Sequence, residues 1–170
     1  MRLKYVILMA VFLLVKSNCY AQINGTVVDA ETGQPVGGAV VLAEWTVTRG
    51  LPGMSYHEIH KSVEVETGNN GNFYLPATHD PLANPPKVVI YKTGYVAWRN
   101  DYIFPAWSKR TDFKYRDGIV VRLEIFREKY SHLEHIDFIE YGIMSFYELP
   151  VTELPKIRMG IKTEKQLARP

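Results

Sequence analysis

The sequence has 170 residues, of which 46% are hydrophobic and 22% are charged, and its formal net charge is +2. A chain of this size and composition can bury a core of its own as one domain, which argues against a disordered or low-complexity protein. The nearly balanced charge also argues against a nucleic-acid partner, because such a protein would carry a clustered basic face.

Residues 1–21 have the parts of a secretory signal peptide. Arg2 and Lys4 give a positive start, residues 5–15 carry no charge, and Cys19 and Ala21 occupy the positions that a signal peptidase reads. We expect cleavage after Ala21. The apolar run is shorter than the roughly 20 residues that cross a bilayer, so we expect no transmembrane span after cleavage.

A second interpretation retains Cys19 as a lipid-modified N-terminus, although Lys16-Ser17-Asn18 lacks the residues usual before such a cysteine. Cleavage after Ala21 would remove three basic residues and no acid, so the mature chain would carry a net charge of −1. It would also remove the only cysteine, so no disulfide is expected. We therefore expect a periplasmic or secreted protein or, if Cys19 is lipidated, a membrane-tethered one.

Seven short runs with strand patterns follow the signal peptide. The clearest alternation lies at residues 119–125, and residues 39–47 place Glu44 and Thr46 opposite an apolar face, which predicts a half-buried strand. Residues 48–57 interrupt this pattern with Gly and Pro and are predicted to be an insertion. The predicted strands are 23–29, 39–47, 59–66, 73–75, 88–91, 95–98 and 119–125. Turn signals at this spacing predict a mainly β fold, a seven-stranded antiparallel sandwich.

The pattern changes after Arg127. Apolar residues recur at helical spacing, and Ser131 with Glu134 has the form of a capping box, so we expect one amphipathic helix over residues 132–147 that packs on the sandwich. The end of the chain is polar and is expected to be a loose or packed-on tail. The predicted organisation is a signal peptide at 1–21, a sandwich at 22–127, a helical segment at 128–149 and a polar tail at 150–170.

Three blocks of the sequence resemble the carboxypeptidase regulatory-like domain and follow that family's order. They are Gly-Thr-Val-Val-Asp…Thr-Gly-Gln-Pro-Val from Gly25, Thr-Gly-Asn-Asn-Gly-Asn-Phe from Thr67 and Val-Val-Ile-Tyr-Lys-Thr-Gly-Tyr from Val88. The match covers residues 22–99. The resemblance implies a seven-stranded transthyretin-like (prealbumin-like) sandwich without catalysis of its own, found in exported proteins beside peptidases and at the front of outer-membrane receptors.

Similar sandwiches also host enzymes, so the alternative function is a small metal- or carbohydrate-dependent enzyme on a transthyretin-like or intradiol-dioxygenase-like sandwich. An intradiol dioxygenase would need two histidines one residue apart as iron ligands, and the sequence has no such pair. His57 and His60, and likewise His132 and His135, are three residues apart, but two ligands do not close a zinc site. We expect His132 and His135 on an exposed polar stripe, opposite a buried face that contains Leu133 and Ile136. We predict no catalytic residue, metal or cofactor.

Aromatic residues gather between positions 91 and 107. Trp98, Tyr102 and Trp107 are the candidate ligand- or partner-binding residues, because an irregular stretch does not dictate burial as strand alternation would. The alternative is a satellite hydrophobic cluster that fixes residues 100–118 to the sandwich. The sequence thus predicts an exported, non-catalytic binding or assembly module of the bacterial cell envelope, with an envelope protein or a glycan as its partner.

Overall fold

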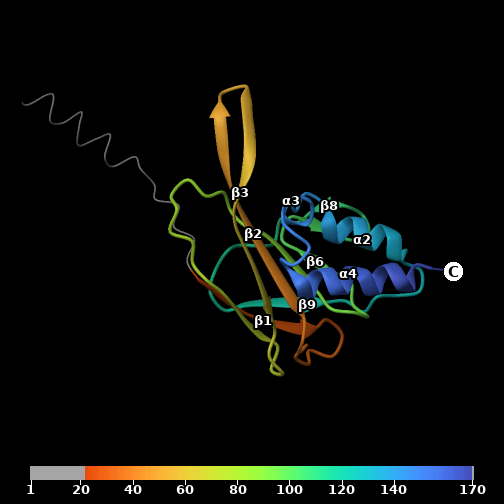
Figure 1. The fold of residues 1–170 in the computed structure, drawn as a ribbon. Coiled ribbons are helices and arrows are strands. Elements are labelled where there is room, and N and C mark those ends of the chain that lie inside the picture. The colour runs from red at the N-terminus through yellow and green to blue at the C-terminus, as the bar shows by residue number, and fades with distance from the viewer. Residues whose placement is uncertain (1–21, 170) are drawn as a thin grey trace, which may run out of the picture.

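The computed structural model describes residues 22–169, which form three layers (Figure 1). A three-stranded sheet packs on a four-stranded sheet, and helices cover the outer face of the four-stranded sheet. The predicted signal peptide, including Cys19, lies outside the described residues. Within residues 22–169, no helix is both long enough and apolar enough to cross a membrane.

The fold is mainly β, as the sequence predicts. The sheet orders are β4-β1-β9 and β3-β2-β5-β6, and β7 pairs with β8 in a separate ribbon. The strands are β1 (Ile23–Asp29), β2 (Val40–Leu51), β3 (Met54–Glu66), β4 (Asn72–Leu75), β5 (Lys87–Tyr91), β6 (Trp98–Arg99), β7 (Tyr102–Ile103), β8 (Ser108–Lys109) and β9 (Ile119–Leu123). The helices are α2 (His132–Glu140), α3 (Ser145–Glu148) and α4 (Pro155–Leu167).

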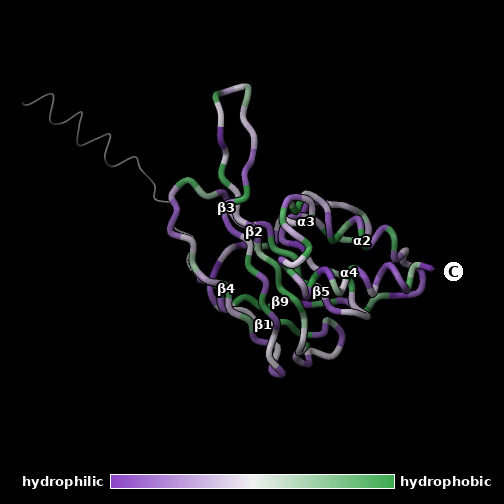
Figure 2. The backbone as a smooth tube through the Cα atoms, viewed as in Figure 1, coloured by the Kyte–Doolittle hydropathy of each residue, from purple (hydrophilic) through white to green (hydrophobic). Residues whose placement is uncertain are grey.

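Alternating side chains build the core between the two sheets. Every second residue of β1 and of β9 is buried, which is the pattern of strands with one face on a core. Figure 2 shows hydrophobic stretches concentrated where the strands stack. The buried residues of this core are Ile23, Val27, Val36, Ala39, Val41, Ala43, Trp45, Phe73, Leu75, Ala83, Val88, Ile90, Trp98, Ile119, Val121 and Leu123.

One strand pair departs from the predicted antiparallel arrangement. β1 and β9 run parallel, with Gly25 opposite Ile119 and Asp29 opposite Leu123. Parallel strands cannot be joined by a tight hairpin, and residues 30–118 form the connection here. The prediction of a wholly antiparallel sandwich is therefore wrong at this pair, because alternation reports which face is buried and not the direction of pairing.

The first half of β2 is buried on both faces, whereas the sequence predicts a half-buried strand. Val41 and Ala43 face the core between the sheets, while Val40 and Leu42 face the helices. The helical layer removes the second face of the strand from water. This leaves Glu44, which lies on that outer face, 1% exposed.

Acidic side chains of the sheet cap two of the helices. The carboxylate of Glu44 accepts hydrogen bonds from the backbone N–H groups of Met144 (3.0 Å) and Ser145 (2.6 Å) and from the Ser145 hydroxyl. Glu64 on β3 accepts from the N–H groups of Lys156 (3.0 Å) and Ile157 (2.6 Å) at the start of α4. Both carboxylates satisfy N–H groups that the first turn of a helix leaves unpaired.

A buried arginine on β6 caps the end of α2. Arg99 is 1% exposed and donates to the carbonyl oxygens of Phe138 (2.9 Å) and Tyr141 (2.7 Å). Its Nε and Nη2 each lie 2.8 Å from a carboxylate oxygen of Asp101. The cation thus meets the carbonyls that the last turn leaves free, and a carboxylate balances its charge.

The C-terminal part differs from the prediction in two ways. Gly142, with φ of 63°, breaks the predicted helix over residues 132–147 into α2 and α3. Residues 150–170, predicted to be a polar tail, contain α4, because Ile157 and Ile161 bury one face of this otherwise polar helix against the sheet. Two apolar positions at helical spacing were too weak a pattern to indicate this helix.

A buried aspartate shapes the first turn of the sandwich. The carboxylate of Asp29 accepts hydrogen bonds from the N–H groups of Thr32 (2.7 Å) and Glu31 (2.9 Å) and from the Tyr95 hydroxyl (3.1 Å). These bonds, foremost that from the Thr32 N–H, lower the pKa of Asp29. The first sequence block therefore makes a turn that contacts Tyr95 at the end of the third block.

Glu44→Ala is expected to lower the free energy of unfolding by about 2–4 kcal/mol, because buried donors lose a charged acceptor. Urea unfolding followed by circular dichroism measures this loss. Glu58→Ala is the matched control, since Glu58 is more than half exposed and pairs with Arg49, and it should cost less than about 1 kcal/mol. Equal losses in the two variants would contradict the capping role of Glu44.

Candidate functional sites

The structure separates the three aromatic residues predicted to form a binding site. Trp98 is 9% exposed and belongs to the core between the sheets, where its ring contacts Phe113 with 5.2 Å between centroids. The Arg110 guanidinium lies over the same ring, 4.9 Å from its centroid. Trp98 therefore has mainly a packing role, and the small part of it that is exposed lines a surface pocket with Arg110 and Phe113.

Tyr102 and Trp107 do lie together, and Tyr141 joins them. The ring centroids of Trp107 are 6.1 Å from Tyr102 and 5.2 Å from Tyr141. Trp107 is 37% exposed and Tyr141 is 52% exposed. We call Tyr102, Trp107 and Tyr141 the aromatic patch. Tyr141 follows α2, and no spacing in the sequence relates it to the other two residues.

The geometry of the aromatic patch does not suit a flat ligand. The three ring planes meet at 62°, 77° and 84°, so the rings contact one another edge to face and share no plane. Trp107 also rests edge to face on Phe138 of α2, with 5.2 Å between centroids. The patch attaches the β7–β8 region to α2 and leaves a small exposed apolar surface, which agrees better with the satellite-cluster alternative than with stacking of a sugar ring.

A second group of functional side chains lies between α2, α4 and β5. Glu164, which is 1% exposed, accepts hydrogen bonds from His132 Nδ1 (2.6 Å) and from the Tyr91 hydroxyl (2.8 Å). His135 Nδ1 lies 3.4 Å from the same carboxylate but is not aligned for a hydrogen bond. We call these four residues the Glu164 cluster. The sequence predicts the opposite placement of His135, on an exposed stripe, whereas this side chain is fully buried.

The prediction failed because α2 is rotated relative to the expected orientation. Leu133, expected on the buried face, is 62% exposed, and His135 points into the apolar layer among Tyr91, Phe104 and Phe126. A buried histidine needs a partner for each polar nitrogen, and Ala97 supplies one through its backbone N–H. The spacing of apolar residues in the sequence cannot indicate a backbone partner of this kind.

The hydrogen bond from Ala97 argues against a metal at this cluster. The Ala97 N–H donates to His135 Nε2 at 2.8 Å, so Nε2 holds the lone pair and Nδ1 carries the proton of the neutral ring. A metal ion beside Glu164 would need the lone pair on Nδ1 instead, and binding would break the bond to Ala97. The cluster therefore fits a structural role, in which α4 is attached to α2 and β5.

The surroundings of Glu164 keep it ionised. Burial raises the pKa of this carboxyl, but the His135 and His132 imidazoles and the Tyr91 hydroxyl lower it more, to about 2. Burial raises the pKa of the Tyr91 phenol, and the neighbouring Glu164 carboxylate adds to the increase. Tyr91 thus remains a neutral donor to Glu164, which does not suit it to act as a base.

The other predicted histidine pair does not converge. His57 Nδ1 lies 3.3 Å from the Thr48 hydroxyl, and His60 Nδ1 lies 3.5 Å from Asp80. The two histidines belong to one strand and have separate partners. Within the part of the chain that the structure describes, no three His, Cys, Asp or Glu side chains are grouped so that they could hold a metal ion.

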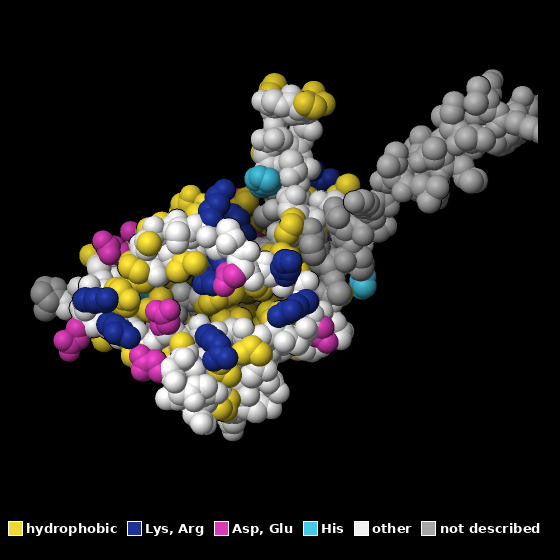
Figure 3. All heavy atoms as spheres, turned by 180° about the vertical axis from the view of Figure 1, so that it is seen from behind, with side chains coloured by type: hydrophobic (Ala, Val, Ile, Leu, Met, Phe, Trp, Pro, Cys, Tyr) yellow, Lys and Arg dark blue, Asp and Glu magenta, His cyan; other side chains and the backbone are white. Residues whose placement is uncertain are grey.

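The most exposed feature of the molecule is the hairpin formed by the ends of β2 and β3, residues 48–58, which we call the arm. Figure 1 shows it projecting beyond both sheets, and every residue in it is exposed. Leu51 is 73%, Met54 80% and Tyr56 61% exposed. Figure 3 shows hydrophobic side chains at its tip. The sequence predicts an insertion here, and the structure shows that the insertion is an extension of two paired strands.

The base of the arm is held in a defined orientation. The pairing of β2 with β3 shifts register between Trp45 and Thr46, and such a bulge bends a strand. Asn84 braces the bend by donating to the hydroxyls of Thr46 and Thr48, each at 3.1 Å. The signal for this hairpin was the Pro52-Gly53 pair, since such dipeptides favour turns between strands.

Comparisons with known proteins identify no family. No protein-family model and no curated protein sequence matches this chain. Among solved structures, the chain is similar to a structure of the Streptococcal ancillary pilin, with a TM-score of 0.31 and 19% sequence identity. The match covers 62% of this chain and 29% of the pilin chain. A similarity this low carries no argument about function.

The Glu164 cluster predicts a specific pH dependence. Because the pKa of Glu164 is about 2 in the fold and 4.5 without it, the carboxylate stabilises the fold fully above pH 4.5, and this stabilisation is lost as the pH falls towards 2. The loss is roughly 3 kcal/mol. Glu164→Gln should therefore be less stable at pH 6 and show a shallower decline in stability between pH 5 and pH 2.5, as urea unfolding at each pH measures.

Glu148→Gln is the control for this experiment, because Glu148 is exposed on α3. Its pH profile should follow that of the unmodified protein. If Glu164→Gln gave the same pH profile as Glu148→Gln, the stabilising role assigned to the Glu164 carboxylate would be contradicted.

Proposed function

We propose that this protein is an exported, non-catalytic binding or assembly module of the bacterial cell envelope that docks a partner through its arm. The observation that carries this proposal is the exposure of Leu51 and Met54 at the end of a projecting, braced hairpin. Apolar side chains at the end of an arm gain nothing from the protein's own core. They are placed to be covered by another molecule.

The energetics favour a partner at the tip. Complete burial of a leucine or methionine side chain contributes about 1.5–3 kcal/mol of free energy. Leu51 and Met54 are mostly exposed, so the isolated chain gains little of this free energy. A partner that covered both side chains would recover it. Between the tip and the sandwich, Arg49 and Glu58 form an ion pair of 3.1 Å across the two strands of the arm.

The carboxypeptidase regulatory-like assignment is part of this proposal. Its support comes from the places that the three sequence blocks occupy. The first forms β1 and the turn at Asp29, the second contains Gly71, whose φ of 74° suits the reversal into β4, and the third forms β5 and the turn at Gly94. The blocks thus supply three turns of the sandwich. Tyr91 is the one residue of the Glu164 cluster that they contain.

A small enzyme is the alternative, and it has less support. The buried titratable side chains around Glu164 are already committed to one another and to the Ala97 N–H, and the Tyr91 hydroxyl donates to the carboxylate. The interpretation as a binding module relies on exposed residues, namely those of the arm and the aromatic patch. Because the three rings of the patch share no common plane, we propose an envelope protein rather than a glycan as the partner.

Capture of a partner by the tagged protein from envelope extract, followed by mass spectrometry, tests the role of the arm. The double variant Leu51→Asp/Met54→Asp should lose the captured partner, because charges at the tip cannot enter an apolar interface. Leu82→Asp is the matched control, since Leu82 is 68% exposed but lies outside the arm, and it should capture the partner normally. Equal capture by all three proteins would overturn docking through the arm.

Export makes a separate prediction about the N-terminus. After expression of the full chain, the intact mass of the purified protein should correspond to a chain that begins at Gln22. A chain that begins at Cys19 with added lipid would change the localisation to a membrane-tethered protein. A chain that retains Met1 and remains inside the cell would contradict export.

A further inference from the structure

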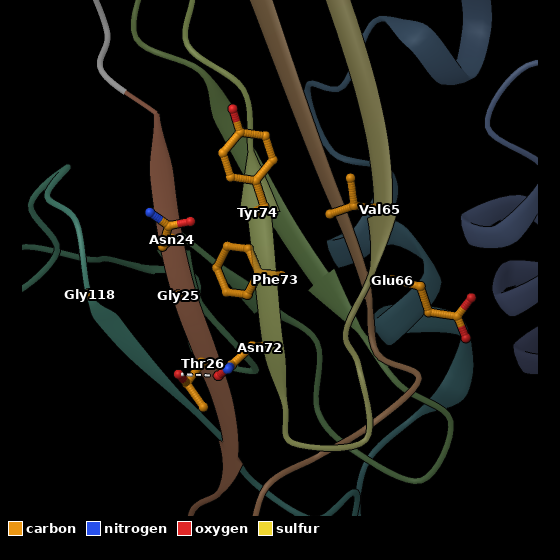
Figure 4. A pocket seen from close by; sticks show the side chains of 9 residues that line it. All are labelled: Asn24, Gly25, Thr26, Val65, Glu66, Asn72, Phe73, Tyr74 and Gly118. Atoms are coloured by element: carbon orange, nitrogen blue, oxygen red, sulfur yellow. Dashed lines mark hydrogen bonds between the residues drawn. The ribbon is translucent and has the colours of Figure 1, made fainter.

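β9 lies at the edge of the three-stranded sheet and has a strand on one side only. Figure 4 shows β1 between β4 and the strand that follows Gly118, which is β9. The Leu123 carbonyl accepts a hydrogen bond of 2.8 Å from the Ala30 N–H, just after β1, so Leu123 turns its backbone groups towards β1. Successive residues of a strand turn these groups to opposite sides. The N–H and C=O groups of Val120 and Arg122 therefore point away from β1.

The chain pairs with this outer side only beyond the end of β9. Residues 94–96 run antiparallel to residues 124–126, and the Val96 N–H donates to the Glu124 carbonyl at 2.7 Å. The chain then leaves this edge and enters β6 of the other sheet. Within residues 22–169, no other strand pairs with the outer side of β9. A strand that filled this position would continue the pairing that residues 94–96 begin.

A groove of about 460 Å³ runs along the same edge. One wall is formed by residues 119–122 together with Glu124, and the other carries Trp98, Ile103 and Phe113. Residues from both faces of β9 line the groove and no residue of β1 does, so the groove follows the open edge. An extended segment paired with β9 would place every second side chain over the apolar wall.

The other sheet edges carry features that discourage the addition of a strand. β3 contains Lys61 and has a bulge in its pairing with β2, and β4 ends just before Pro76. Arg110 covers the edge of β6 and donates to the Arg99 carbonyl at 2.6 Å. Lysines, prolines, bulges and covering segments are the usual protection of an edge strand. Residues 119–123 contain neither lysine nor proline, so β9 is less protected.

One charged side chain at the open part of β9 lacks a partner. Arg122 is exposed, and no carboxylate of the described residues forms an ion pair with it. Arg110, across the groove, is already paired with Asp112 at 3.4 Å. Glu124 shares the face of Arg122 but lies where Val96 already pairs. An acidic residue on an added strand, directly opposite Arg122, would complete a cross-strand pair of opposite charges.

We propose that the open edge of β9 binds an extended segment of a partner protein as an added antiparallel strand. The segment carries apolar residues at alternate positions, which face the groove, and an acidic residue opposite Arg122. The donors and acceptors of Val120 and Arg122 repeat at the spacing of a polypeptide backbone, so a peptide strand can satisfy all of them. This surface is separate from the arm, and the inference therefore goes beyond the proposed function.

A synthetic peptide tests this contact. The probe is acetyl-Ser-Val-Glu-Val-Thr-Val-Ser-amide, whose glutamate lies opposite Arg122 and whose threonine lies opposite Val120 when its valines face the groove. Hydrogen exchange followed by NMR should show that the Val120 and Arg122 amides exchange quickly in the free protein and slowly in the complex. The Val121 amide, which faces β1, should exchange slowly in both states. Absence of binding, or binding that leaves Val120 and Arg122 unprotected, would overturn the inference.

Two control peptides separate backbone pairing from side-chain contact. Methylation of the glutamate and threonine amide nitrogens removes the two N–H groups that face β9, and it should weaken binding at least about tenfold. Replacement of the glutamate by lysine should weaken binding about threefold, because like charges would then lie opposite each other. Arg122→Glu should reverse this preference. Equal binding of the methylated and unmethylated peptides, or an unchanged preference in Arg122→Glu, would contradict the proposed pairing.

Variants of Val120 test the edge itself. Val120→Pro removes an N–H that faces away from β1, a position at which edge strands tolerate proline, and should weaken peptide binding at least about tenfold. Val120→Thr keeps this N–H and should bind like the unmodified protein. The arm variant Leu51→Asp/Met54→Asp should also bind normally, since its substitutions lie outside β9. Equal unfolding midpoints show that a variant is folded, and the methylated peptide tests the same pairing on the unmodified protein.

A second copy of the chain is the competing occupant of this edge. Sedimentation velocity over a concentration series separates the two possibilities. The unmodified protein and Val120→Pro should show the same mass at every concentration if the occupant is a different protein. A dimer that forms in the unmodified protein, is lost in Val120→Pro and is dissociated by the peptide would overturn the assignment of this edge to a different protein.

Discussion

Charged side chains buried beneath the helical layer organise this molecule. The outer face of the four-stranded sheet carries Glu44 and Arg99, each 1% exposed, and each meets the terminus of a helix that covers it. A buried charge without such a partner would be strongly destabilising, so the helices can settle only where their ends reach these side chains. The sheet thereby determines where α2 ends and where α3 begins, and Glu64 does the same for α4. The position of Glu164, and with it the contact between α2 and α4, follows from this arrangement.

The sequence predicts best those parts of the fold that depend on local patterns. The alternation in β1 and β9 and the glycine turns identify the strands of the sandwich, because one face of each strand is apolar. The sequence predicts the burial of a residue poorly where an element distant in the chain covers that residue. The sequence pattern indicates a solvent-facing Glu44, but α3 covers this side chain. It likewise indicates an exposed His135, but this side chain is buried and accepts a hydrogen bond from the Ala97 N–H. α4 was missed because two isoleucines among charged residues carry little periodic signal.

The candidate sites illustrate the same division. Trp98, Tyr102 and Trp107 are close in sequence, yet the first lies at the start of β6 and faces the core, while the other two lie beyond it and meet Tyr141. Proximity in sequence could suggest an aromatic cluster but could not divide it between two layers. In the arm, Gly50 and Gly53, with φ of 96° and 86°, serve a tight reversal between long strands. The same residues, considered alone, suggested a break in structure.

The parallel pairing of β1 with β9 also bears on the order in which the chain can fold. β1 is the first strand of the sandwich, and its two neighbours are β4 and the last strand, β9. When the chain emerges with its N-terminus first, β1 lacks one neighbour until residue 123 has appeared, and the outer face of the central sheet stays uncovered until α4 follows. Pairings between such distant segments form slowly, since a long loop must close before any contact compensates for its lost entropy. A polypeptide whose closing contacts arrive last can complete its sandwich only after nearly the whole of it has emerged.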